Sequence, residues 1–109
     1  MTIDYPTAEV QVFPQFKGGE KEMRAAMFFD GRTRILKGRL APGASIGLHR
    51  HDTSCEVMYF LEVSGRVLLD GVEERVHADM VHYCPKGSSH TLLNDGTVDL
   101  VFVGVVPEQ

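Results

Sequence analysis

The sequence predicts an all-β fold in one small domain, with short strands closed into a barrel or packed as a sandwich. From residue 32 onward, segments rich in β-forming residues alternate with turn signals at short intervals. No segment carries the apolar period over about 12 residues that an amphipathic helix needs. A chain of 109 residues suits a single domain of this kind.

The N-terminal residues 1–22 are expected to form an irregular arm. Two prolines and the Gly18-Gly19 pair interrupt regular structure there. Apolar and polar residues alternate over residues 9–13, which allows one strand in the arm. Residues 23–109 are expected to form the barrel domain, and its first segment, 23–29, fits a helical turn as well as a strand.

Strands and turns then follow one another along the chain. Turn residues separate the strands, because proline fixes its φ and glycine accepts positive φ. The segments Asp70-Gly71 and Asn94-Asp95-Gly96 have the composition of hairpin turns, and Ser64-Gly65 that of a turn or bulge. The predicted strands cover residues 33–40, an extended stretch that contains 49–51, then 56–63, 66–69, 72–77, 80–84, 90–93 and 97–106.

Composition and charge exclude several classes of protein. The formal net charge is −4 and lysine and arginine form no cluster, so we expect no nucleic-acid partner. The N-terminus has no basic and apolar leader, and no apolar run approaches about 18 residues, so we expect a cytoplasmic protein without a membrane partner. Cys55 and Cys84 are expected to be free thiols, since neither belongs to a CxxC pair.

Three histidines and one glutamate give the strongest functional signal. His49 and His51 are two residues apart on an extended segment, so both imidazoles project from one face. Glu56 begins the next strand after a short polar loop, and His90 begins a later strand. A small barrel would bring these four side chains together.

The physical argument for a metal rests on the buried carboxylate. An unpaired carboxylate inside a barrel costs several kcal/mol, against a total stability of roughly 5–15 kcal/mol. A divalent cation held by neutral imidazoles and the carboxylate removes that penalty and adds binding energy. We therefore predict one divalent metal ion bound by His49, His51, Glu56 and His90.

Two segments resemble the sequence motifs of the cupin family. Residues 43–65, GASIGLHRHDTSCEVMYFLEVSG, are similar to the first motif, with Val63 where the closing glycine usually falls. Residues 85–94, PKGSSHTLLN, are similar to the second motif, PxGxxHxxxN, with Asp79 in place of its usual leading glycine. The strand pattern extends the resemblance over residues 32–106.

The resemblance implies a cupin-type double-stranded β-helix, a jelly-roll barrel of six or more strands with the metal deep in its open mouth. It also implies a homodimer, often with an N-terminal strand lent to the sheet of the partner. Residues 7–13 are the candidate for such an exchange. Alternatively, they cover the edge of their own barrel or are partly disordered.

Further pocket residues depend on the register of two strands. Met58 and Phe60 share the face of Glu56 on one strand, where they form either pocket walls or core. In residues 80–84, one register turns His82 inward as a group for proton transfer, and the other turns Tyr83 inward. Both are candidate catalytic residues.

The donor set limits the metal and the chemistry. Three imidazoles and a carboxylate suit iron, manganese, nickel, cobalt, copper or zinc, and leave one or two positions open for a small-molecule ligand. The resemblance implies a metal-dependent enzyme that acts on a small organic molecule, of the dioxygenase type or of the isomerase or lyase type. The alternative is a non-catalytic module that binds a small molecule or a metal.

Overall fold

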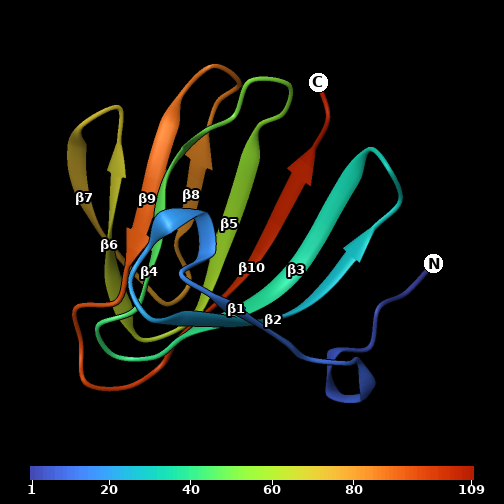
Figure 1. The fold of residues 1–109 in the computed structure, drawn as a ribbon, viewed down its shortest axis with the longest axis horizontal. Helices are drawn as coiled ribbons and strands as arrows, with labels where there is room; N and C mark the ends of the chain where they lie inside the picture. The colour runs from blue at the N-terminus through green and yellow to red at the C-terminus, as the bar shows by residue number, and fades with distance from the viewer.

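Ten β-strands form two antiparallel sheets that face each other (Figure 1). The computed structural model describes residues 1–109. The larger sheet has the order β1-β2-β3-β10-β5-β8, and the smaller one has the order β4-β9-β6-β7. The strands are β1 (Gln11–Pro14), β2 (Glu22–Phe29), β3 (Thr33–Leu40), β4 (Ser45–Arg50), β5 (Glu56–Glu62), β6 (Ser64–Leu69), β7 (Val72–His77), β8 (Val81–Cys84), β9 (Ser89–Leu93) and β10 (Leu100–Pro107). The predicted all-β fold is confirmed.

The only helical segments are two single turns of 3-10 helix, η1 (Tyr5–Thr7) and η2 (Phe16–Gly18). Neither has the length and the apolar character that a membrane span requires. The first strand, β1, pairs with β2 of the same chain and lies at one edge of the larger sheet.

Burial against the core explains why residues 23–29 form a strand. Met23 and Ala25 point into the core with exposures of 0% and 1%. β2 also pairs with β3 along nearly its whole length. Pairing and alternate burial together override the local sequence, which fits a helical turn equally well.

Two predicted turns differ from the structure. Asn94-Asp95-Gly96 does not close a hairpin, because β9 belongs to the smaller sheet and β10 to the larger one. The segment instead carries the chain between the sheets. Ser64 and Gly65 are already part of β6, and the bend falls one residue earlier, at Val63, whose φ is 59°.

The interior changes from apolar to polar along β4 and β9. Ile46 pairs with Leu92 in the hydrophobic core, whereas His49 pairs with His90 further along the same two strands. The core therefore fills one part of the barrel, and polar side chains line the interior near the other end.

Candidate metal centre

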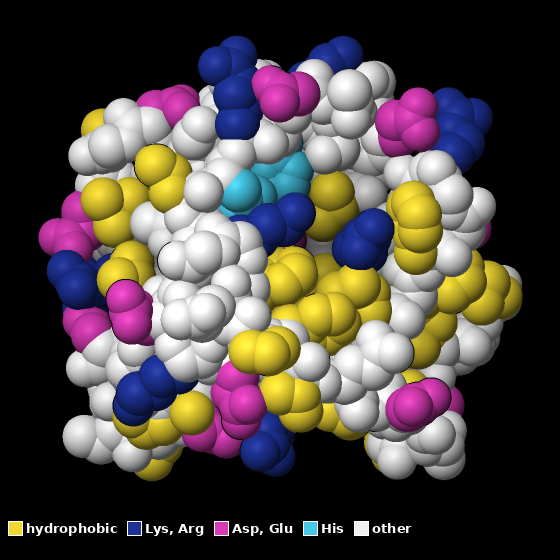
Figure 2. Space-filling view, viewed as in Figure 1, with side chains coloured by type: hydrophobic (Ala, Val, Ile, Leu, Met, Phe, Trp, Pro, Cys, Tyr) yellow, Lys and Arg dark blue, Asp and Glu magenta, His cyan; other side chains and the backbone are white.

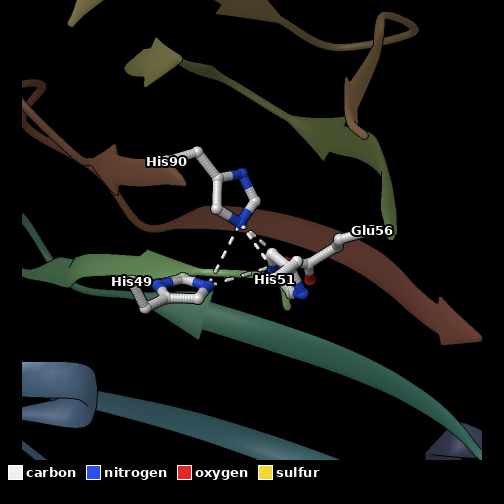
Figure 3. A group of neighbouring side chains, drawn as sticks. All are labelled: His49, His51, Glu56 and His90. Atoms are coloured by element: carbon white, nitrogen blue, oxygen red, sulfur yellow. Dashed lines mark hydrogen bonds and ion pairs between the residues drawn. The ribbon is translucent and has the colours of Figure 1, made fainter. Parts of the chain in front are cut away.

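The four predicted ligands converge from three segments of the barrel (Figure 3). His49 lies on β4, His51 directly follows this strand, Glu56 begins β5 and His90 lies on β9. One nitrogen or carboxylate oxygen from each residue lies within 4.8 Å of those from the other three. The structure thus brings the whole predicted ligand set together.

A β-bulge in β4 turns His49 into the barrel. Ile46 and His49 are three residues apart on β4, but their partners on β9, Leu92 and His90, are only two apart. One extra residue in β4 therefore lies between the two pairs, and it reverses the alternation of faces. As a result Leu48 is 69% exposed, whereas His49 faces the interior beside His90.

Each imidazole presents Nε2 to the centre because a different group holds its Nδ1. The Nδ1–H of His49 donates to the Gly47 carbonyl at 2.8 Å, and Nδ1 of His51 shares a hydrogen bond of 3.0 Å with the Ser54 hydroxyl. Nδ1 of His90 shares a hydrogen bond of 3.0 Å with Nε2 of His82. In the tautomer that carries the ring proton on Nδ1, the lone pair of each Nε2 is directed inward.

Glu56 is a buried anion in contact with all three imidazoles. Its Oε1 lies 2.9 Å from Nε2 of His90, 3.2 Å from that of His51 and 3.9 Å from that of His49. Burial by itself raises the pKa of the Glu56 carboxyl, but its close contacts with the three imidazoles outweigh burial and hold this pKa well below its usual range. The site therefore combines one negative charge with three nitrogen donors.

The spacing of the donor atoms fits a single metal ion. Nε2 of His90 lies 3.0 Å from Nε2 of His51 and 3.1 Å from Nε2 of His49. Two ligands that each lie about 2.1 Å from an ion, at right angles to one another, are about 3.0 Å apart. The chemistry of the donors, nitrogen with one carboxylate oxygen, suits a divalent transition metal.

A pocket of about 370 Å³ leads from the surface to this centre. Figure 2 shows histidine side chains at the bottom of a hollow, with lysine and arginine side chains at its border. The pocket is lined by Phe16, Lys17, Arg34, Leu36, His49, Arg50, His51, Asp52, Thr53, Ser54, Glu56 and Val106.

The other candidate residues lie outside this pocket lining. His82 is buried, with 5% exposure, and contacts His90 on the side away from the other ligands. Tyr83 is 50% exposed on the opposite face of β8. Met58 and Phe60 are completely buried in the hydrophobic core.

Sequence reasoning missed Lys17, Arg34 and Ser54 as pocket residues. Arg34 carried a usable signal, because the alternation in β3 puts it on the same face as the buried residues Leu36 and Leu40. Nothing in the sequence indicates that η2, which carries Lys17, packs beside β4.

The two facing sheets and the three-histidine, one-glutamate centre define a small β-barrel protein with a candidate metal site in its mouth. Residues 36–106 match a family model described as the cupin domain. The chain belongs to the cupin family, and the fold predicted from the two motifs is confirmed.

Solved structures and a curated relative agree with this assignment. The oxalate-binding protein of Thermotoga maritima is 31% identical over 96 residues, which cover 83% of this chain and 79% of that protein. The crystal structure of a predicted oxalate decarboxylase from the same organism superposes with a TM-score of 0.94, at 26% identity, over 100% of both chains. The Cnp3 cupin domain of Schizosaccharomyces pombe shares the fold, with a TM-score of 0.82 at 14% identity over 100% of this chain and 74% of that one.

Proposed function

We propose that this protein binds one divalent transition metal through His49, His51, Glu56 and His90, and binds a small organic carboxylate at the same centre. The observation that carries the proposal is the convergence of three Nε2 atoms and a buried carboxylate within 4.8 Å. Four protein ligands leave one or two coordination positions for a further oxygen donor. When bound, such a metal supplies a Lewis acid and, if it is redox-active, a route to dioxygen chemistry.

Similar proteins support the choice of a small organic carboxylate as the ligand. The 31% identical protein from Thermotoga maritima is named for oxalate binding, and the structure with a TM-score of 0.94 is described as a predicted oxalate decarboxylase. A pocket of about 370 Å³ has room for oxalate or for a larger organic acid. Oxalate is therefore the first ligand to test.

An enzymatic role is the leading form of this proposal, with decarboxylase, dioxygenase, isomerase and lyase reactions as the classes to test. Cleavage of the carbon–carbon bond of hydrogen oxalate gives formate and carbon dioxide without an external oxidant. A non-catalytic binding module is the second candidate. It is favoured by the positions of His82 and Tyr83, neither of which lines the pocket as a group for proton transfer.

Calorimetry with oxalate tests the proposal. The parent protein, loaded separately with Mn²⁺, Co²⁺ and Zn²⁺, is compared with the metal-free parent and with a His49→Ala/His51→Ala double variant. We expect oxalate to bind only to the metal-loaded parent. Equal binding by the metal-free protein would contradict the proposal. Formation of formate by the loaded parent would establish an enzyme, and binding without turnover would favour the module.

We also propose that the protein is a homodimer, assembled through the outer face of its larger sheet. Two rows of mostly apolar side chains cross this face from β2 to β8. In each row, consecutive residues are directly paired on adjacent strands. The rows are Phe28, Ile35, Val105, Val57 and Tyr83, and then Ala26, Lys37, Val103, Tyr59 and Val81. At the β8 end, Val81 and Tyr83 are 59% and 50% exposed. A second copy of the chain would cover this apolar surface.

A further inference from the structure

Three cationic side chains line the pocket that leads to the metal centre, and they differ in how their charge is compensated. Arg50 is paired with Asp52, with Nε 2.9 Å from Oδ1. Neither Lys17 nor Arg34 lies within ion-pair distance of any carboxylate. Two positive charges at the pocket wall are therefore available to a ligand.

Arg34 is oriented by apolar partners that leave most of its donors free. It lies on the inner face of β3, and its guanidinium carbon is 4.5 Å from the centre of the Phe29 ring. One Nη1–H donates to the sulfur of Met27 at 3.2 Å. A guanidinium has five N–H donors, so several remain for a planar anion such as a carboxylate.

Lys17 is held at the pocket by the close packing of η2 on β4. A Cβ atom at Gly47 would lie 2.0 Å from the carbonyl oxygen of Lys17, so only glycine permits this approach. Gln15, Lys17 and Lys21 all have positive φ, of 48°, 56° and 56°. Non-glycine residues adopt this conformation at a cost, and it persists where surrounding contacts impose it, often at functional sites.

We propose that Lys17 and Arg34 form an anion subsite that makes the pocket selective for small dicarboxylates. One carboxylate of the ligand faces the centre formed by His49, His51, Glu56 and His90, and the second is bound by Arg34 and Lys17. The inference rests on the proposed binding of a carboxylate at the metal. It adds the residues that select a dianion over a monoanion.

A matched ligand series tests this subsite by calorimetry on the Mn²⁺-loaded protein. The dicarboxylates are oxalate, malonate and succinate, and the monocarboxylates are formate, acetate and propionate. We expect at least one dicarboxylate to bind the parent about 10-fold or more tightly than its monocarboxylate counterpart. Arg34→Gln and Lys17→Met should each reduce this preference, and the double variant should abolish it, with monocarboxylate affinity and metal content unchanged.

Arg50→Gln is the control, because Arg50 lines the same pocket but is already paired with Asp52. Its preference for dicarboxylates should equal that of the parent. The subsite is overturned if the Arg34 and Lys17 variants keep the parent's preference, or if the parent binds both series with equal affinity. Binding of neither series to the loaded parent would overturn the proposed carboxylate function as well, whereas equal binding of both series would overturn the subsite alone.

Discussion

His90 depends on another histidine for its orientation, whereas His49 and His51 depend on nearby groups of their own chain segment. The carbonyl that holds His49 is two residues away, and the hydroxyl that holds His51 is three residues away. His82 comes from β8 in the other sheet, and its ring stacks on that of His90 with centres 5.2 Å apart. When a neutral His82 accepts a hydrogen bond from the Nδ1–H of His90, Nε2 of His90 is left free to face the centre.

Removal of the acceptor at position 82 should weaken metal binding. We expect His82→Leu to lower the affinity for Zn²⁺ by about 10- to 100-fold, since the orientation of His90 is then no longer fixed. His82→Gln keeps an acceptor and should recover part of the affinity. Competition with a fluorescent chelator measures both values, and equal affinities for the Leu variant and the parent would contradict the positioning role.

Loss of a ligand should remove both the metal and its stabilising effect. We expect His51→Ala and His90→Ala each to abolish metal retention, measured by elemental analysis. Metal at about 1,000 times its Kd adds about 4 kcal/mol to the stability of the folded state. EDTA should therefore lower the melting temperature of the parent but leave both variants unchanged. Variants as stable and as metal-loaded as the parent would refute the ligand assignment.

The four candidate ligands could be predicted from the sequence, but the groups that surround them could not. The spacing of His49, His51 and Glu56 indicated a common site. Their residue types indicated a cation, because such side chains are costly to bury without one. The bulge that turns His49 inward has only a weak sequence signal, the isolated Gly47 in β4. Val63 and Asp79, at the two positions where the motifs usually have glycine, adopt positive φ of 59° and 72°. Both residues therefore adopt a backbone conformation that glycine adopts at less cost.

At the scale of elements, the packing of η2 on β4 should tolerate no side chain at position 47. Gly47→Ala places a Cβ atom 2.0 Å from the Lys17 carbonyl oxygen, so the loop or the strand must move. We expect a loss of about 1–3 kcal/mol in the free energy of unfolding, measured with urea. Gly96→Ala is the control, because its Cβ would meet only the Asn94 Oδ1, at 3.4 Å. Equal stabilities of the two variants would argue against this packing.

The Asp70 carboxylate, in the turn between β6 and β7, connects this hairpin to the start of β9. The Asp70 carboxylate accepts a hydrogen bond from the Ser89 N–H at 2.9 Å, beside the candidate ligand His90. Hydrogen bonds from the Ser89 N–H and the Ser88 hydroxyl lower the pKa of the Asp70 carboxyl. The ionised form is therefore favoured by the folded state, and its contribution is present above the unfolded pKa of about 3.9 and lost as the pH falls through the lower folded pKa.

Asp70→Asn should reveal this dependence. Asparagine keeps an acceptor oxygen and tolerates the positive φ of 48° at this position, but it carries no charge. We expect the variant to be less stable than the parent at pH 7, and the two proteins to approach equal stability as the pH falls through the lowered folded-state pKa of Asp70. Thermal unfolding at a series of pH values checks this. A stability difference that does not change with pH would show that the charge is irrelevant.

The positions of the strands were easier to predict from the sequence than the pairing between strands. Residues 33–40 and 72–77 form β3 and β7 with the predicted bounds, because turn residues on either side delimit them locally. The segment Asn94-Asp95-Gly96 indicates a chain reversal but not which strand the next one joins. Pairing between distant segments depends on which faces are buried in the complete barrel. No local sequence pattern contains this information.

For the whole molecule, the apolar face of the larger sheet leads to a prediction about assembly. We expect the parent to sediment as a dimer and a Val81→Glu/Tyr83→Glu variant to sediment as a monomer, since buried unpaired carboxylates oppose association. Val72→Glu is the control, because Val72 is 64% exposed on the smaller sheet. Analytical ultracentrifugation distinguishes the species. A monomeric parent would remove the basis for the dimer.

The position of β10 between β3 and β5 also has a consequence for folding. During synthesis, both neighbours leave the ribosome well before residues 100–107, so each has an unpaired edge until the last of the ten strands arrives. Such edges attract other chains, and pairing between segments so distant in sequence is slow to form. Nascent chains that stall before residue 100 should therefore aggregate or recruit chaperones, whereas completion of β10 closes the larger sheet in one late step.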